Sequence, residues 1–202
     1  RKDIQFNTRV SKVNPIENDL WSVTFEDGKT NIYKGVMVCN GHHWSKRFPE
    51  YEGEFTGETM HSKDFKTADQ VKDKRVLVIG AGNSAFDIVS ECARSSTESY
   101  LSVRRGVWVF PKTFMGKPLG ALHVPKLPDW LQEIVVKIML KITIGDLREY
   151  GLPKPEIKVF DRHPTVNTET LMHIKHGRIK VKGGVKRLNG KQVIIEDGST
   201  EE

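Results

Sequence analysis

Cysteine is scarce in this sequence, and long apolar runs are missing from it. Its only cysteines, Cys39 and Cys92, lie far apart and form no CxxC pair, so the sequence encodes neither a thioredoxin-like redox site nor a cysteine zinc site. We expect both to be small buried residues. No secretory signal opens the chain, and no apolar run reaches the roughly 20 residues that span a bilayer. A soluble, cytoplasmic protein is therefore expected.

Charge and composition suit several partners. Lys and Arg number 32 against 26 Asp and Glu, giving a formal charge of +6, which suits nucleic acid, an anionic membrane surface or a phosphorylated cofactor. A hydrophobic content of 37% is typical of a folded globular chain. Because the sequence starts at Arg1 without a methionine and stops at Glu202 just after a turn signal, we expect a piece of a longer protein.

The residue pattern predicts an α/β chain that changes character near residue 40. The first forty residues alternate like an antiparallel meander, with strands expected at 4–6, 9–13, 21–25 and 33–39, the last of them buried. Gly, His, Pro and charged residues dominate 40–74, which is linker composition. A buried-type strand at 74–80, a glycine turn, a helix at 85–94 and a strand at 99–103 then form one βαβ unit without its third strand.

Two further patterns follow this unit. Residues 129–142 predict a helix, with Asp129 as N-cap and Gln132 completing a capping box. Its apolar circumference indicates burial against the core or a missing partner, with a membrane surface as the alternative. Residues 185–198 repeat the order of 10–28, a short strand, an alternating strand and an acidic-Gly turn. This repeat suggests a nucleotide domain inserted between two returns to a neighbouring domain, or two unrelated hairpins.

The glycine turn has the GxGxxA pattern of a dinucleotide site. Gly80 permits the tight turn, Gly82 lets the backbone approach a pyrophosphate, and Ala85 allows close packing of helix on strand, with the helix N-terminus facing the anion. Asn83 and Ser84 are placed to donate to phosphate, although Ser84 could instead serve only as the helix N-cap. The alternative for the whole motif is an ordinary glycine turn.

The end of the second strand lacks the acidic residue that holds the ribose of NAD. In its place stand Arg104 and Arg105. A carboxylate would repel a 2′-phosphate, whereas a guanidinium binds it through bidentate charge-assisted hydrogen bonds. The sequence therefore favours NADP(H) over NAD(H), unless the two arginines are part of a solvated basic face.

Four segments carry motifs of one known family. Residues 55–66 fit the fingerprint FxGxxxHxxx(Y/F), with matches at Phe55, Gly57, His61 and Phe65. Residues 78–88 look like that family's second glycine motif, 102–109 like its arginine-containing segment, and 38–42 like its hinge strand. Over about 36–109, the sequence thus resembles the flavin-containing monooxygenases.

The resemblance implies a domain plan and two cofactors. It predicts partial FAD-domain β-strands at 1–47, a linker with the fingerprint at 48–74, a Rossmann-like NADPH-binding domain at 75–184 and truncated return strands at 185–202. In the whole protein, NADPH would reduce FAD, and O2 would be used to oxygenate a small-molecule nitrogen or sulfur nucleophile. The GxGxxG motif for FAD and the strand beneath the flavin are missing here, so the chain would need these FAD-binding segments of the same protein for activity.

Residue roles and rival functions follow from the same resemblance. His61 is expected to organise the linker, and we assign no catalytic residue. Closure of the fingerprint by Phe65-Lys66, rather than by Trp followed by Pro or Asp, favours heteroatom oxidation over Baeyer-Villiger chemistry. An NADPH-dependent flavin reductase is a rival, and so is a basic nucleotide- or nucleic-acid-binding module, for which no motif is present. His163 and His176 lie in segments like those of longer bacterial members, without metal-ligand spacing.

Overall fold

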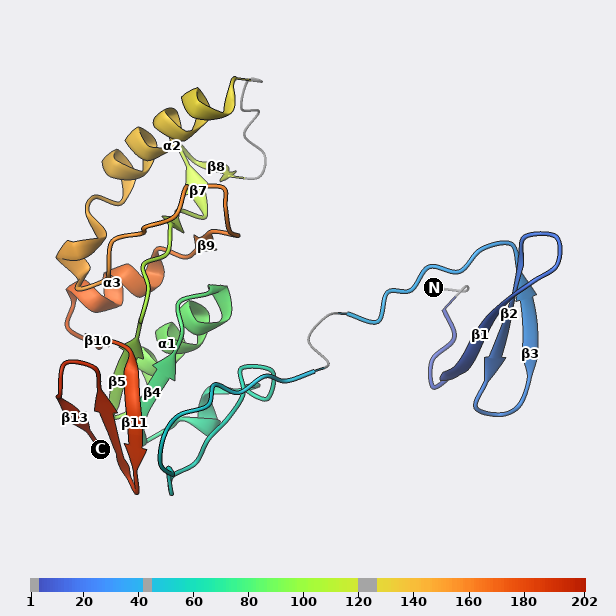
Figure 1. The fold of residues 1–202 in the computed structure, drawn as a ribbon, viewed down its shortest axis with the longest axis horizontal. Coiled ribbons are helices and arrows are strands. Elements are labelled where there is room, and N and C mark those ends of the chain that lie inside the picture. The colour runs from blue at the N-terminus through green and yellow to red at the C-terminus, as the bar shows by residue number, and fades with distance from the viewer. Residues whose placement is uncertain (1–3, 42–44, 120–126) are drawn as a thin grey trace. The chain divides into compact units, whose positions relative to one another are not determined.

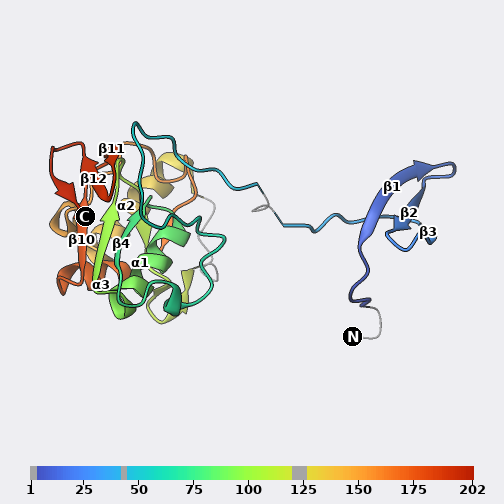
Figure 2. The ribbon, with the colours of Figure 1, turned by 90° about the horizontal axis from the view of Figure 1, so that it is seen from below.

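The computed structural model describes residues 4–41, 45–119 and 127–202. The chain divides into two compact units, Arg1–Ser45 and Lys46–Glu202, whose ribbons are drawn in Figures 1 and 2. Residues 185–202 lie in the second unit. The assignment of these units to an FAD and an NADPH domain stays a prediction.

The first unit is the predicted antiparallel meander. Strands β1 (Val10–Ile16), β2 (Leu20–Phe25) and β3 (Thr30–Tyr33) pair in the order β1-β2-β3. The turn before β3 is closed by Asp27, whose Oδ1 accepts from the Lys29 N–H at 3.0 Å, and by Gly28 at φ +83°. Acidic-Gly pairs favour such turns because glycine adopts positive φ without steric cost.

Two strands predicted for this unit do not form. Residues 4–6 are irregular, and β3 ends at Tyr33, so the buried strand expected at 33–39 is wrong beyond that residue. Met37 and Val38 are 87% and 75% exposed. An apolar segment becomes a buried strand only when other backbone pairs with it, and no described residue does so. Cys39 is accordingly exposed, against expectation, whereas Cys92 is buried as predicted.

The second unit is built on a parallel sheet of three strands. Strands β4 (Arg75–Ile79), β5 (Glu98–Ser102) and β10 (Ile179–Lys182) lie in the order β10-β5-β4, and helix α1 (Asn83–Ser95) connects β4 to β5. The predicted βαβ unit is confirmed, but it does not lack a third strand, because β10 pairs with β5 in parallel. Four alternating residues that far along the chain give too weak a local signal.

Apolar side chains from α1, β5 and later segments form the main core. Phe86, Val89 and Leu101 are fully buried there. Helix α3 (Glu169–Lys175) packs on α1, and the Ser90 and Thr170 hydroxyls share a buried 2.8 Å hydrogen bond at the contact. The 3-10 helix η1 (Ala68–Gln70) precedes the sheet and contacts α1.

A long excursion leaves the sheet after β5. It contains β6 (Val109–Phe110), which pairs in parallel with β9 (Thr165–Val166), the hairpin of β7 (Thr113–Phe114) and β8 (Lys117–Pro118), helix α2 (Asp129–Thr143) and the 3-10 helix η3 (Leu147–Tyr150). Figure 1 shows α2 and the β7-β8 hairpin at the end of the unit away from β4 and β11.

Helix α2 begins differently from the prediction. Its N-cap is Pro128 rather than Asp129, and no side chain caps it; the Gln132 amide instead donates to the Leu127 carbonyl at 2.5 Å. The predicted capping box is therefore wrong. The helix begins one residue earlier than expected, after Pro128, whose ring fixes its own φ angle. Leu140 is buried, but much of the apolar surface is exposed: Trp130, Ile134, Val135, Ile138 and Ile142. No helix among the described residues is long and apolar enough to cross a membrane.

The predicted repeat is a second meander with the same local structure as the first. Strands β11 (Val185–Asn189), β12 (Gln192–Ile195) and β13 (Thr200–Glu201) pair in sequence order. Each meander has a register shift after its first paired valine, Val10 or Val185. Val185 and Ile195 pack with Leu77 of β4 and with Tyr51 and Phe55. These strands therefore share a small core with the parallel sheet.

Candidate functional site

The glycine turn and the arginine pair lie at one edge of the sheet. Strands β4 and β5 are parallel, with Ile79 paired to Ser102 at their carboxyl ends. The Gly80 N–H donates to the Ser102 carbonyl at 3.0 Å, so the turn leaves β4 directly beside the segment that carries Arg104 and Arg105. Ligands of open parallel sheets bind at this carboxyl edge.

Backbone donors in the turn are open to solvent. Gly80 has φ +125°, which a side chain would strain, and Gly82 is the N-cap of α1. The first helical hydrogen bond runs from Phe86 N–H to the Gly82 carbonyl at 3.1 Å. The N–H groups of residues 82–85 therefore have no acceptor on their own helix, and they meet none among the described residues. Such a row of free donors at a helix N-terminus favours an anion.

The two turn glycines differ in the space around them. A Cβ on Gly82 would meet nothing within 4 Å, whereas one on Gly80 would lie 3.8 Å from the Ala85 Cβ. This places Ala85 where the motif predicts close packing of helix on strand. The space next to Gly82 is open, so its backbone is accessible.

Asn83 and Ser84 both lie exposed in the first turn of α1. Ser84 is the second helical residue, so the alternative that it caps the helix is wrong. The Asn83 side chain is already engaged: its Oδ1 accepts from the Val166 N–H at 2.7 Å, and its amide donates to the Pro164 carbonyl at 3.3 Å. Phosphate binding by these residues stays a prediction.

The sequence did not reveal that residues 164–166 form hydrogen bonds to the glycine turn. No role at this site was predicted for residues 163–167, yet the Thr165 hydroxyl donates to the Ala81 carbonyl at 2.6 Å. Asn167, fully buried, donates to Asp87 Oδ1 at 2.7 Å and accepts from the Thr170 N–H at 3.0 Å. The polar residues at alternate positions, His163, Thr165 and Asn167, were the only local signal.

Arg104 and Arg105 are exposed and form no ion pair or hydrogen bond with a described residue. The backbone of the next residue, Gly106, packs closely against another segment. A Cβ added to Gly106 would lie 2.3 Å from the backbone carbon and oxygen of Lys154. Only glycine allows that contact. The arrangement presents two free guanidinium groups beside the open turn.

The fingerprint residues precede β4 and make local packing contacts. The His61 ring packs edge-on against Phe48, with ring centroids 5.5 Å apart, and its Nδ1 accepts from the Lys63 N–H at 3.1 Å. Phe55 contributes to the core beneath the second meander, and a Cβ on Gly57 would lie 2.5 Å from its ring. Phe65 is partly buried. The role of His61 as an organiser of the linker stays a prediction.

A charged network crosses the sheet surface. Glu98 of β5 accepts hydrogen bonds from Tyr100 at 2.7 Å, Lys180 at 2.9 Å and Arg75 at 2.8 Å. These donors lower the pKa of Glu98 to about 2. The network joins β4, β5 and β10, and Arg75 also reaches Glu201 of β13 at 3.6 Å. It ties the sheet to the second meander.

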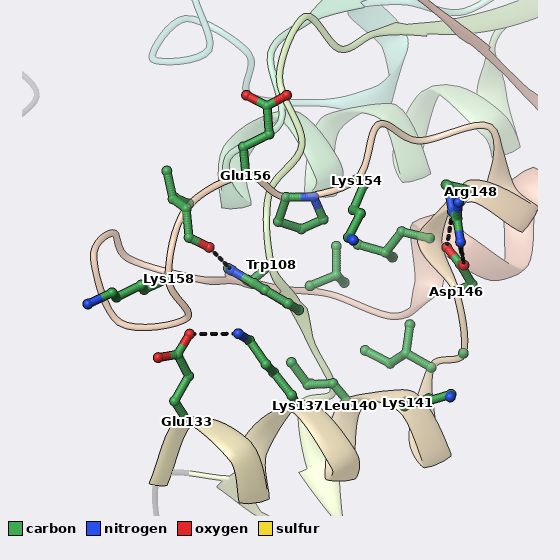
Figure 3. Close-up of a pocket in the computed structure, with 16 residues that line it drawn as sticks. Trp108, Glu133, Lys137, Leu140, Lys141, Asp146, Arg148, Lys154, Glu156 and Lys158 are labelled. Carbon is green, nitrogen blue, oxygen red and sulfur yellow. Dashed lines mark hydrogen bonds and ion pairs between the residues drawn. The ribbon is translucent and has the colours of Figure 1, made fainter. Parts of the chain in front are cut away.

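A pocket of about 510 Å³ lies between α2 and residues 154–158 (Figure 3). Trp108 crosses its middle, donating to the Ile157 carbonyl at 2.8 Å, and Lys137 pairs with Glu133 at 2.8 Å. None of its lining residues belongs to the glycine turn or the arginine pair. The pocket is therefore separate from the dinucleotide candidate site.

Comparisons with solved structures support the fold. The chain matches Tmm from Pelagibacter sp. strain HTCC7211 with a TM-score of 0.56 at 22% identity, over 99% of this chain and 33% of that one. It matches NADP+-bound cyclohexanone monooxygenase from Rhodococcus sp. Phi1 with a TM-score of 0.61 at 16% identity, over 100% and 51%. At these identities the likeness concerns the fold alone.

Comparisons with sequences go further. The chain is 34% identical to flavin-containing monooxygenase 5 of Homo sapiens, and 34% identical to dimethylaniline monooxygenase [N-oxide-forming] 2 of Mus musculus. Each match covers 100% of this chain and 41% of the relative, so the chain spans about two fifths of their length. The family model described as flavin-binding monooxygenase-like matches residues 1–202. The chain therefore belongs to the flavin-binding monooxygenase family.

Proposed function

We propose that the second unit is a Rossmann-like NADPH-binding domain of a flavin-dependent monooxygenase. The observation that carries the proposal is the position of the open turn at 80–84 beside the unpaired Arg104 and Arg105, at the carboxyl edge of two adjacent parallel strands. One end of this site suits a pyrophosphate and the other a 2′-phosphate.

The chain offers groups of suitable chemistry for both ends of that cofactor. The N–H groups of Gly82, Asn83 and Ser84 would hold the pyrophosphate, and the guanidinium groups of Arg104 and Arg105 would hold the 2′-phosphate. No described acidic side chain pairs with these arginines, so no ion pair has to break on binding. In the whole protein, NADPH would supply a hydride to FAD, most of whose binding residues would lie on other segments.

For the whole protein we propose oxygenation of soft nitrogen or sulfur nucleophiles with O2. Closure of the fingerprint by Phe65-Lys66 and the match to an N-oxide-forming relative support this choice. A Baeyer-Villiger monooxygenase would convert ketones to esters. A flavin reductase would oxidise NADPH without forming an oxygenated product. Product analysis with a tertiary amine, a sulfide and a cyclic ketone, using the whole protein, separates the three.

Charge reversal at the arginine pair tests the cofactor site. Arg104→Glu should weaken NADPH binding about 10- to 100-fold, because it removes charge-assisted hydrogen bonds to the 2′-phosphate and adds repulsion. NADH lacks that phosphate, so its affinity should change much less. Titration calorimetry measures both, with Arg187→Glu on the exposed face of β11 as the matched charge control. An equal loss for the two cofactors would refute the clamp.

A further inference from the structure

The pyrophosphate turn is held by a segment about eighty residues further along the chain. Thr165, 2% exposed, donates its hydroxyl hydrogen to the Ala81 carbonyl at 2.6 Å. Its neighbours clasp the start of α1, with the Val166 N–H donating to Asn83 Oδ1 at 2.7 Å and the Asn83 amide donating to the Pro164 carbonyl at 3.3 Å. Three side-chain hydrogen bonds thus join 164–166 to 81–83.

The Thr165 contact fixes the direction of a donor in the proposed site. A trans peptide is planar, so the Ala81 carbonyl and the Gly82 N–H share one plane and point in opposite directions. The described peptide bonds are all trans. Holding the carbonyl toward Thr165 therefore turns the Gly82 N–H away from Thr165, and this N–H meets no acceptor among the described residues.

The same segment also contacts the element that follows the arginines. β9 pairs in parallel with β6, and the Thr165 N–H donates to the Trp108 carbonyl at 2.9 Å. Trp108 comes shortly after Arg104 and Arg105 in the chain. One short strand thus binds the pyrophosphate turn through side chains and the continuation of the arginine segment through its backbone.

We propose that Thr165 is a positioning residue for the dinucleotide site, aiming the Gly82 N–H at the pyrophosphate through the Ala81 peptide. Asn83 supports it by holding 164–166 with its side chain, while its own backbone N–H stays free for the ligand. The proposal rests on the proposed function, since it specifies how the pyrophosphate half of that site is oriented. Neither side chain touches the reacting atoms.

Removing the Thr165 hydroxyl without changing the side chain's shape tests the proposal in the full 202-residue chain. Thr165→Val should weaken NADPH, NADH and inorganic pyrophosphate by a similar factor of about ten, because one donor to a charged group is misdirected. Thr165→Ser retains the hydroxyl and should restore most of the affinity. Titration calorimetry gives the three dissociation constants for each variant.

A matched control separates orientation from general loosening. Ser90→Ala removes a buried hydroxyl bond between α1 and α3, away from the turn. It should shift the denaturation midpoint about as much as Thr165→Val while leaving the three dissociation constants unchanged. In amide NMR spectra recorded without ligand, Thr165→Val should displace the Gly82 resonance, and Ser90→Ala should not.

The outcomes are distinct. If the wild-type chain binds neither NADPH nor pyrophosphate, both the proposed function and the positioning role fall. If the wild type binds and Thr165→Val binds equally well, or if Ser90→Ala weakens binding as much, the positioning role alone falls. Should Thr165→Val not fold, Thr165→Ala removes the same hydroxyl, and unchanged affinity of a folded Thr165→Ala for all three ligands would overturn the proposal.

Discussion

Alanine substitutions at the two turn glycines should have different effects, one on the stability of the fold and the other on NADPH binding. Gly80 has φ +125°, a conformation that strains any residue with a Cβ, whereas Gly82 has φ −80° and ψ 175°, an extended conformation open to all residues. The two positions are two residues apart in the same motif. Alanine at Gly80 should therefore destabilise the fold, and alanine at Gly82 should obstruct the ligand.

The expected magnitudes follow from these conformations. At Gly80, backbone strain of about 1–3 kcal/mol outweighs the roughly 0.4–1 kcal/mol gained from a less flexible unfolded chain, so the net loss should be about 1–2 kcal/mol. At Gly82, that gain roughly offsets the loss of about 0.5–1 kcal/mol expected when alanine, a poorer N-cap, replaces glycine. With nothing within 4 Å of the new Cβ, stability should change by less than about 0.5 kcal/mol.

Urea denaturation followed by circular dichroism measures the first effect, and calorimetric titration with NADPH measures the second. Gly82→Ala should retain wild-type stability yet bind NADPH at least about tenfold more weakly, since its methyl group occupies the space through which a pyrophosphate approaches the backbone. Wild-type affinity in Gly82→Ala, or a loss of stability there as large as in Gly80→Ala, would refute the reasoning.

Two further predictions concern the surroundings of the site. Gly106→Ala places a Cβ 2.3 Å from the Lys154 backbone, so it should cost about 1–3 kcal/mol and weaken NADPH through the displaced arginines; a urea midpoint equal to wild type would contradict it. The pKa of Glu98 is lowered to about 2 by hydrogen bonds from Tyr100, Lys180 and Arg75, so its ionised form stabilises the fold above its ordinary pKa of 4.5, and that stabilisation is lost as pH falls toward 2. Glu98→Gln should therefore be less stable than wild type at pH 6, with a difference that shrinks by pH 3; urea midpoints at both values measure it, and a constant difference would exclude the network as its cause.

Turns and helix starts were predictable where the residues that determine them are adjacent in the sequence. The turn at 80–85 combines two glycines, a small residue and the start of an amphipathic helix, and each imposes its own backbone constraint. The same holds for the acidic-Gly turns at 27–28 and 197–198, whose backbone hydrogen bonds recur in both meanders. Proline 128 overrode the capping pattern at α2 because it is itself a local constraint.

Contacts between distant segments decided the rest. Residues 35–39 have the composition of a buried strand but no pairing partner among the described residues, so they are exposed. Conversely, the four residues of β10 give little local signal yet complete the parallel sheet beside β5. Strand formation depends on a neighbour's backbone hydrogen bonds, which periodicity in one segment does not contain.

The sequence by itself determined the chemical character of this protein: an open glycine turn after one strand and two arginines after the next, in a chain of the flavin-binding monooxygenase family. Only the tertiary structure decided that Thr165 and Asn83 join a segment eighty residues away to that turn. The physical reason is that glycine and arginine act through conformation and charge intrinsic to each residue, whereas a positioning hydrogen bond exists only once folding has brought donor and acceptor together.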